Sequence, residues 1–311
     1  MNEGSDNEPG KGSLVSVNIQ DILGLSKPLA KLVDVVARGT GVLYRPRAIL
    51  KEAKAKAEAK IYLAQAEGTK IEIVESSKIK VEKMKEFAGL DIAIRAEARV
   101  KRQEFLRQKN IEQIAFKTET YLPEEVSEVS IDQDWIARFF NTAMDVSDVQ
   151  MQEVWARLLA GEIEKPGSYS LRTMEVLKNM TKSDAEIFEK ACRLVFDNLL
   201  IVVRERNTKN PLEKFDLPFS EQIHLANIGL LTENFLGYTE KFSGESKEIS
   251  YQGKKYNMLS KQVPLKLEFT TVGIASVGRE LARLVPPNPH HEYFEDVVQY
   301  FKSMGVELKE Q

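Results

Sequence analysis

Residues 134–172, DWIARFFNTAMDVSDVQMQEVWARLLAGEIEKPGSYSLRT, form the stretch in which the local folding signals agree best. Ile136 and Phe139, with the apolar residues that follow them at three- and four-residue spacing, lie on one face of a helix. That helix ends at a Val-Ser-Asp run, in which Ser147 or Asp148 is placed to cap the helix that follows. The stretch therefore predicts two consecutive amphipathic helices.

The second helix is predicted to stop at Gly161, and a Pro-Gly turn and two serines that can cap a third helix come next. The apolar stripe of the second helix consists of Met151, Val154, Trp155, Leu158 and Leu159. We expect Trp135, Trp155 and Leu158 to form part of a helical core, because aromatic residues on amphipathic helices are usually buried.

The same residues carry a resemblance. The run D-W-x-x-x-F-F … V-S-D-x-x-M-Q-x-x-W-A-x-L-L-A-G-E-x-x-x-P-G-S-x-S-x-R-T resembles the core of a bacterial family known only as a domain of unknown function. The resemblance extends from about Gly24 to Leu281. More loosely, the chain is similar to the abortive-infection alpha proteins, which are associated with anti-phage defence. The resemblance implies no established reaction and no catalytic residue; it implies a defence role, with a second defence protein as a partner.

Composition limits the class of protein. The chain has 311 residues, 42% of them hydrophobic and 29% charged, and a single cysteine, so no disulfide forms within it. Residues 1–13 are acidic and Gly-rich, which predicts no signal peptide, and no stretch reaches the roughly 18 uninterrupted apolar residues of a spanning helix. We therefore expect a cytoplasmic protein that is soluble or peripheral to a membrane.

Residues 19–44 predict an amphipathic helical segment that is interrupted near Lys27-Pro28. Its apolar face either binds a membrane surface, as basic amphipathic helices do, or packs against this chain or a second subunit. The residues that would make this contact are Ile22, Leu29, Leu32, Val33 and Val36.

Residues 45–122 have the Ala/Glu/Lys/Arg composition of a long helix, without a proline between Pro46 and Pro123. Such a helix would span on the order of 100 Å, too long for one domain of this size to bury. The segment from Arg45 to Lys117 contains 18 Lys and Arg against 11 Asp and Glu, whereas the whole chain has a net charge of −3. This basic rod predicts a homo-oligomer or an anionic partner.

The C-terminal hundred residues change character. Alternation around Gln252-Gly253 predicts a hairpin, and 265–269 predict a further strand. Ser183 and Asp184 are expected to cap a helix that runs to about Val203, and because residues 194–196 and 199–203 are apolar on nearly all sides, this helix is predicted to be central to the core. The expected fold is mainly α, with a long N-terminal helical rod, a central helical domain and a small winged-helix-like α+β module. The predicted segments are a disordered tail at 1–18, an amphipathic helical segment at 19–44, a long basic oligomerisation helix at 45–122, a central helical domain at 130–205 and the winged-helix-like module at 206–311.

The motifs do not identify a reaction. No nucleophile elbow, Walker loop or zinc-protease signature is present, and the adjacent His290 and His291 follow a Pro-rich loop. Glu153 and Arg157 have the four-residue spacing of an ordinary stabilising pair. We expect no cofactor and no metal, and the sequence favours a non-enzymatic protein.

The leading hypothesis is an oligomeric scaffold or sensor in phage defence. The alternative is a nucleic-acid-binding protein, in which basic side chains of the long helix and of the hairpin meet phosphates. The side chains that would do so are Lys78, Lys80, Lys83, Lys85, Arg99, Lys101, Arg102, Lys254 and Lys255. A peripheral membrane protein is a third hypothesis.

Overall fold

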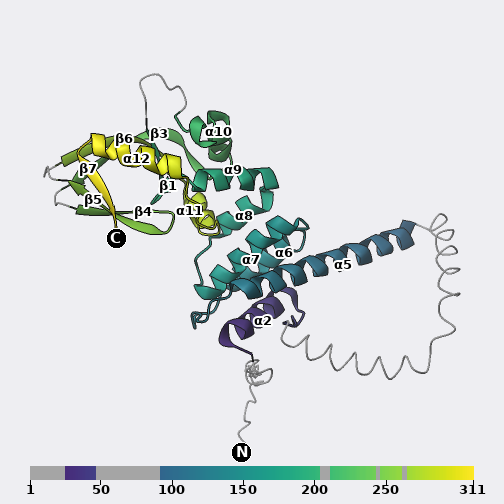
Figure 1. Ribbon diagram of the computed structural model, residues 1–311. Coiled ribbons are helices and arrows are strands. Elements are labelled where there is room, and N and C mark those ends of the chain that lie inside the picture. Colours follow the sequence, from purple (N-terminus) through teal and green to yellow (C-terminus); the bar gives the residue numbers. More distant parts are fainter. Residues whose placement is uncertain (1–24, 47–91, 204–210, 243–245, 261–264) are drawn as a thin grey trace, which may run out of the picture.

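The computed structural model describes residues 25–46, 92–203, 211–242, 246–260 and 265–311. In these ranges the chain is a mixed α+β protein: helices make up the N-terminal part, and the C-terminal half holds a seven-stranded antiparallel sheet (Figure 1). The expected helical character is therefore confirmed for the first part only. The sequence predicted a small winged-helix-like module in the C-terminal part, and this prediction contained fewer strands than the observed sheet.

The N-terminal part is built on four α-helices and a short 3-10 turn. They are α2 (Lys27–Thr40), α5 (Ile92–Thr118), η1 (Glu119–Tyr121), α6 (Gln133–Ala143) and α7 (Val149–Glu164). α5 packs on α7 and α2 packs on α6, while the N-terminal end of α5 extends away from the body (Figure 1). The core between α6 and α7 is aromatic: Phe139 stacks on Trp135 and meets Trp155 edge-on, each with ring centroids 5.3 Å apart.

Local chemistry explains where these helices begin and end. Asp148 accepts hydrogen bonds from two free N–H groups at the start of α7, those of Gln150 and Met151, both at 2.9 Å. The predicted stop at Gly161 was wrong, because α7 continues to Glu164. Gly161 is needed there for a different reason: a Cβ on it would lie 2.8 Å from the Tyr169 ring.

Two shorter helices follow, α8 (Leu171–Asn179) and α9 (Lys182–Cys192). The prediction that a helix runs on to about Val203 was also wrong, because β1 (Val195–Phe196) and β2 (Leu199–Val202) form a tight hairpin there. β2 lies between β1 and β6 inside the sheet, with Leu200 fully buried. A strand covered on both faces is apolar throughout, so its sequence lacks the alternation by which strands are recognised.

The sheet has the strand order β3-β6-β2-β1-β4-β5-β7. Its other strands are β3 (Leu231–Phe242), β4 (Ser246–Tyr251), β5 (Lys254–Ser260), β6 (Leu265–Ile274) and β7 (Val306–Glu310). The predicted hairpin at Gln252-Gly253 is confirmed as the β4–β5 connection, and both of its central residues have positive φ.

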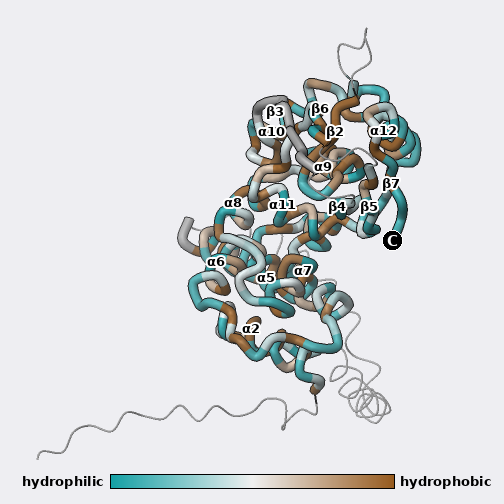
Figure 2. Tube along the Cα trace, turned by 90° about the vertical axis from the view of Figure 1, so that its left-hand side faces the viewer, coloured by the Kyte–Doolittle hydropathy of each residue, from teal (hydrophilic) through white to brown (hydrophobic). Residues whose placement is uncertain are grey.

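Helices accompany this sheet: η2 (Glu213–Phe215), α10 (Phe219–Asn227), α11 (Ser276–Ala282) and α12 (His291–Ser303). α12 packs on the sheet through Phe301, whose ring meets Phe269 at 5.5 Å, and through Tyr293, whose hydroxyl bonds both backbone groups of Ile201. α8 contacts α11, so these two helices lie at the junction between the helical part and the sheet (Figure 2).

Several predictions fall on other parts of the chain. The tail at 1–18 and the segment 47–91, which is most of the predicted rod, lie outside the described residues. α5 accounts for the last 27 residues of the rod before η1. None of the described helices combines the length and the apolar character that crossing a membrane requires.

Candidate functional site

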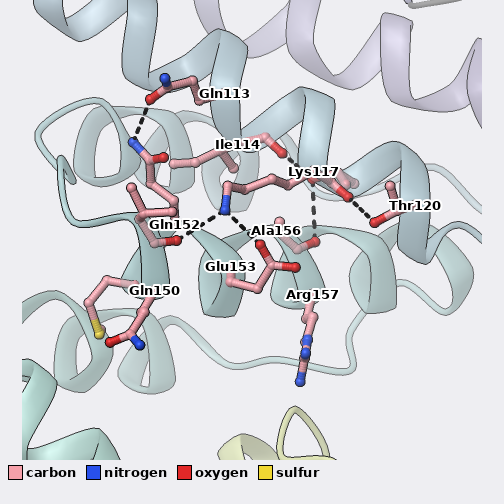
Figure 3. Close-up of polar contacts among 12 residues, drawn as sticks. Gln113, Ile114, Lys117, Thr120, Gln150, Gln152, Glu153, Ala156 and Arg157 are labelled. Atoms are coloured by element: carbon pink, nitrogen blue, oxygen red, sulfur yellow. Dashed lines mark hydrogen bonds and ion pairs between the residues drawn. The ribbon is translucent and has the colours of Figure 1, made fainter.

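A polar network joins α5 and η1 to α7 (Figure 3). Lys117 Nζ donates to Glu153 Oε2 at 2.7 Å and to the carbonyl of Val149 at 3.0 Å. The Tyr121 hydroxyl donates to the other carboxylate oxygen of Glu153. One carboxylate on α7 therefore binds two groups that come from α5 and from the turn after it.

Electrostatics keep the Glu153 carboxylate ionised. Partial burial alone would raise its pKa, but the hydrogen bonds from Lys117 and Tyr121 and the charges of Lys117 and Arg157 outweigh burial. The net result is a pKa below the ordinary value of 4.5. A carboxylate held in this way is suited to a fixed ion pair and poorly suited to accepting a proton near neutral pH.

Gln152 extends the network along α7. Its side-chain amide donates to Gln113 Oε1 at 3.1 Å and to the carbonyl of Val146 at 2.9 Å. The Gln152 side-chain oxygen is buried and has no hydrogen-bond partner among the residues that the structure describes. The amide therefore ties α7 to α5 and to the loop before α7, and it leaves one acceptor unsatisfied.

Arg157 lies one turn after Glu153 and connects the helical part with the C-terminal half. Its guanidinium donates to the carbonyl of Leu284 at 2.9 Å and to the Tyr121 hydroxyl at 3.4 Å. The guanidinium carbon lies 5.0 Å from the centre of the Tyr121 ring. Arg157 thus bonds Leu284 and Tyr121, while Glu153 bonds Lys117. Although Glu153 and Arg157 are four residues apart on α7, they therefore do not form the simple ion pair that this spacing suggested.

A cavity of about 410 Å³ opens beside this network, between α7, α9 and the segment after α11. Glu153 and Arg157 line it on one side, and Lys182, Glu186 and Glu189 of α9 lie on the other. Apart from Gln150, the rest of the lining is apolar and includes Met151, Val154, Leu177, Met180, Phe188, Leu281, Leu284 and Val285. The volume falls in the range of small-molecule sites, but the charged groups of α7 that line the cavity are already engaged with other protein groups.

A second group of hydrogen bonds involves residues 162–173 of the stretch quoted at the start of the sequence analysis. Glu162 is buried on α7, and its carboxylate accepts the N–H of Gly167 at 2.6 Å and that of Tyr169 at 3.1 Å. Glu280 of α11 accepts the N–H of Ser170 at 2.6 Å and the Thr173 hydroxyl at 2.5 Å. Two carboxylates from distant parts of the chain therefore hold one Pro-Gly-Ser loop and the start of α8.

Burial dominates the electrostatics of Glu162. It raises the pKa of the carboxyl, repulsion from Glu280 adds to the rise, and the backbone N–H groups of the loop oppose it without cancelling it. Because these bonds satisfy backbone groups, the role of the pair is to fix the junction between α7, α8 and α11. No sequence signal linked residues 162 and 280, which are far apart in the chain.

The predicted nucleic-acid contacts divide into three groups. Lys78, Lys80, Lys83 and Lys85 lie outside the described residues. Arg99, Lys101 and Arg102 are exposed on α5, and Lys101 forms an ion pair with Glu97 at 2.6 Å. On the hairpin, Lys254 pairs with Glu310 at 2.8 Å and Lys255 with Glu248 at 2.9 Å. Lys101 on α5 and both hairpin lysines therefore have acidic partners within the chain.

The apolar face of α2 is covered by this chain. Leu32, Val33 and Val36 are buried in the common core and Leu29 is partly buried against it, whereas Ile22 lies outside the described residues. Contact of these four side chains with a membrane would require α2 to leave its place on α6 and α7.

The three residues expected in the core occupy the same buried cluster. Trp155 is 1% exposed, Leu158 is fully buried and Trp135 is 4% exposed. The indole N–H of Trp135 donates to the carbonyl of Tyr169 at 2.8 Å, which ties α6 to the Pro-Gly-Ser loop.

The histidines act in local structure. His290 caps α12 by accepting the N–H of Tyr293, and His224 Nε2 lies 2.5 Å from Asp184 Oδ1. Among the residues that the structure describes, no group of three or more His, Cys, Asp or Glu side chains is placed to hold a metal ion.

Fold and site together define a mixed α+β protein in which a helical part, a Glu-fixed loop and an antiparallel sheet meet at α8 and α11. Residues 94–298 match the family described as "Protein of unknown function (DUF2806)", so the chain belongs to this family. The expected membership in a family of unknown function is confirmed. No curated protein and no solved structure shows significant similarity to the chain.

Proposed function

We propose that this protein is a non-enzymatic scaffold or sensor that works as a homo-oligomer. The observation that carries the proposal is an exposed apolar stripe on α5, which we define as Ile94, Phe105 and Phe116 and call the α5 stripe. These side chains are 48%, 70% and 40% exposed. They recur every 11 residues, which is close to three helical turns, so they lie on one face.

Isolated exposed apolar residues are common on protein surfaces, but a repeated stripe along one helix marks an interaction surface. The opposite side of α5 is already used within the chain, since Ile114 is 1% exposed and Thr118 bonds the carbonyl of Ala156 on α7. Each large apolar side chain that a partner covers contributes about 1.5–3 kcal/mol at full burial. A second copy of α5 is the simplest apolar surface to cover the stripe.

The non-enzymatic part of the proposal is supported by what the polar groups do. Glu153, Glu162 and Glu280 accept hydrogen bonds from protein groups that they hold in place. The sensor alternative is supported by the cavity beside Arg157, which lies where the helical part meets the segment after α11.

Light scattering coupled to size-exclusion chromatography tests self-association. We expect a mass above the 35.3 kDa of one chain for the wild type and a lower mass for Phe105→Glu. The matched control is Leu106→Glu, because Leu106 is 46% exposed but points to another side of α5. A wild-type protein of 35.3 kDa at all concentrations would contradict the proposal.

A role in bacterial anti-phage defence of the abortive-infection type is the second part of the proposal, and the sequence likeness of the central helices supports it. We expect cells that express the protein, together with its second defence protein, to reduce phage plaques, and cells that express Phe105→Glu in its place to lose this protection. Equal plaque numbers with and without the wild-type protein would contradict a defence role.

Nucleic-acid binding is the second candidate function, and the arrangement of basic side chains on α5 favours it. Arg95, Arg99 and Arg102 are exposed and lie at four- and three-residue spacing along one flank of the helix. We expect DNA binding measured by fluorescence anisotropy to weaken steeply as salt rises, because phosphate contacts release counterions. Arg99→Glu should weaken it further, and absence of binding at low salt would remove this function.

A further inference from the structure

We propose that the cavity between α7 and α9 binds a small zwitterion with an apolar body, of the class of hydrophobic amino acids and dipeptides. In this arrangement Arg157 binds the carboxylate of the ligand, and Glu189 binds its ammonium group. This inference rests on the sensor part of the proposed function and names the class of ligand for it. Three observations carry it: the two helix faces that border the cavity, the opposite charges on these faces, and the apolar residues between them.

One face of α7 and one face of α9 border the cavity. The lining residues of these helices that are not buried occupy positions i, i+3, i+4 and i+7, which lie on one side of a helix. They are Gln150, Glu153, Val154 and Arg157 on α7, and Lys182, Ala185, Glu186 and Glu189 on α9. The cavity measures about 410 Å³ and also touches α8 and the segment 281–286. A ligand there contacts both the helical part and the segment that follows α11.

Arg157 makes the α7 face positive. Its guanidinium bonds two neutral oxygens, the carbonyl of Leu284 at 2.9 Å and the Tyr121 hydroxyl at 3.4 Å. Glu153 lies on the same face, but its two carboxylate oxygens accept from Lys117 and Tyr121. A guanidinium has five N–H donors, and the Nε–H of Arg157 has no acceptor among the residues that the structure describes. Figure 3 shows that the Arg157 side chain extends away from α5. Arg157 therefore retains donors and charge for a ligand carboxylate.

The α9 face is negative, because it carries two carboxylates against one lysine. Lys182 pairs with Glu186 at 3.8 Å, whereas Glu189 is exposed and has no cationic partner in the described part of the chain. Glu186 and Glu189 are three residues apart, so they are neighbours on the helix surface. An ammonium group at this face meets the free carboxylate of Glu189 first and that of Glu186 next to it.

The surface between the two charged faces is apolar. Its buried members are each at most 7% exposed, and they are Met151, Leu177, Phe188, Leu281 and Leu284. A ligand side chain that covers this surface gains free energy from the apolar area that both partners remove from water. Met151 and Met180 add flexible thioethers that adapt to the shape of a ligand. The ligand therefore needs an apolar body in addition to its charges.

A ligand with a single charge fits this cavity less well. An anion would bind Arg157 but approach the two carboxylates of α9, and a cation would bind α9 but leave Arg157 without an anion. A zwitterion satisfies both faces at once. The charge pattern thus selects a zwitterion, and the apolar residues select one with a hydrophobic side chain.

Isothermal titration calorimetry with the full-length wild-type protein tests the site without any substitution. The probes are L-phenylalanine and the dipeptide L-leucyl-L-phenylalanine, and we expect at least one of them to bind with a Kd of about 1 mM or tighter. N-acetylation of the probe removes its ammonium charge, and amidation of its carboxyl group removes its carboxylate. Each modification should weaken binding by roughly three- to tenfold.

Two substitutions assign the two ends of the ligand. Glu189→Gln should weaken binding of the zwitterion by roughly three- to tenfold and leave the affinity for the N-acetylated probe unchanged. Arg157→Gln should weaken binding of the zwitterion by as much and leave the affinity for the amidated probe unchanged. Glu175→Gln is the matched control and should change neither, because Glu175 is exposed on α8 and does not line the cavity. Thermal unfolding without ligand checks the fold of Arg157→Gln, and the exposed position 189 keeps the test decisive if that variant unfolds.

The outcomes separate this inference from the proposed self-association. Absence of binding of both probes at about 10 mM would overturn the site, whatever mass the protein has in solution. Equal affinity for the zwitterionic and the blocked probes would overturn the charge assignment, as would losses that neither Glu189→Gln nor Arg157→Gln reproduces. The expected losses in a protein that stays at 35.3 kDa would support the site and contradict the homo-oligomer.

Discussion

The two sides of α5 differ in how their apolar residues are used. On one side, Ile111 and Ile114 are buried against α7, and Thr118 bonds a carbonyl of that helix. On the other side, Phe105 is 70% exposed. Both sides have comparable residue types, so hydrophobicity alone does not separate the face that builds the chain from the face that is open to a partner. The two faces differ in where they lie relative to α7: one packs against that helix and the other does not.

The difference has an energetic consequence. Removing a buried side chain costs the transfer free energy of its atoms and leaves a cavity, whereas removing an exposed one costs little in the isolated chain. Substitutions on the two faces should therefore affect two different measurements: the free energy of unfolding for the packed face, and the mass in solution for the α5 stripe.

The largest effect on stability is expected for Trp155→Ala. Trp155 is 1% exposed on α7 and meets Phe139 edge-on, so its loss should lower the free energy of unfolding by about 3–5 kcal/mol. Phe105→Ala, at a mostly exposed aromatic residue, is the matched control and should change it little. Thermal and urea unfolding measure both variants. An unchanged melt for Trp155→Ala would mean that this face is a binding surface and not a core.

A smaller effect is expected within α5 itself. Ile114→Ala should lower the free energy of unfolding by about 2–4 kcal/mol, because Ile114 is buried in the contact with α7. Ile94→Ala, which removes the same atoms from a side chain that is 48% exposed, should leave the unfolding of dilute protein nearly unchanged and weaken self-association. Equal destabilisation by the two variants at low concentration would abolish the distinction between the two faces.

Local chemistry made part of this fold predictable. Asp148 caps α7 as its type and position indicate, and Ser170, one of the two serines after the Pro-Gly turn, caps the third helix of this stretch, α8. Gln252-Gly253 forms the turn of a hairpin, and Gly253 takes its positive φ without steric cost because it has no Cβ. In each case the deciding interaction lies within a few residues of the chain.

The remaining features of the fold depend on contacts between parts of the chain that are far apart in sequence. The run from Leu194 to Val203 is apolar apart from Asp197 and Asn198 at the turn, because β1 and β2 lie inside the sheet, and this pattern resembles a buried helix. The contacts of Glu280 with Ser170 and of Arg157 with Leu284 join residues more than a hundred positions apart. No local pattern encodes such a pair, so the sequence did not reveal the junction that they hold.

The smallest expected effect is a difference in the pH dependence of stability between two carboxylates of α7. Glu153 lies at the contact with α5, and Glu162 lies at the Pro-Gly-Ser loop. The pKa of Glu153 lies below 4.5 in the folded protein, whereas that of Glu162 lies above it. A lowered folded pKa gives stability that is present above the unfolded pKa and is lost as pH falls through the folded pKa. A raised folded pKa has the opposite sign: the folded state binds the proton more tightly, and stability is lost as pH rises through the folded pKa.

The two substitutions should therefore alter different parts of the pH profile of stability. Glu153→Gln should flatten the loss of stability below about pH 4.5, because the variant no longer has an ion pair to lose on protonation. Glu162→Gln should change the profile above about pH 4.5, where stability should rise with pH more than in the wild type. Urea unfolding at closely spaced pH values from 3 to 7 measures both. If both variants changed the profile on the same side of pH 4.5, the contrast between the ion pair at α5 and the buried carboxylate at the loop would be wrong.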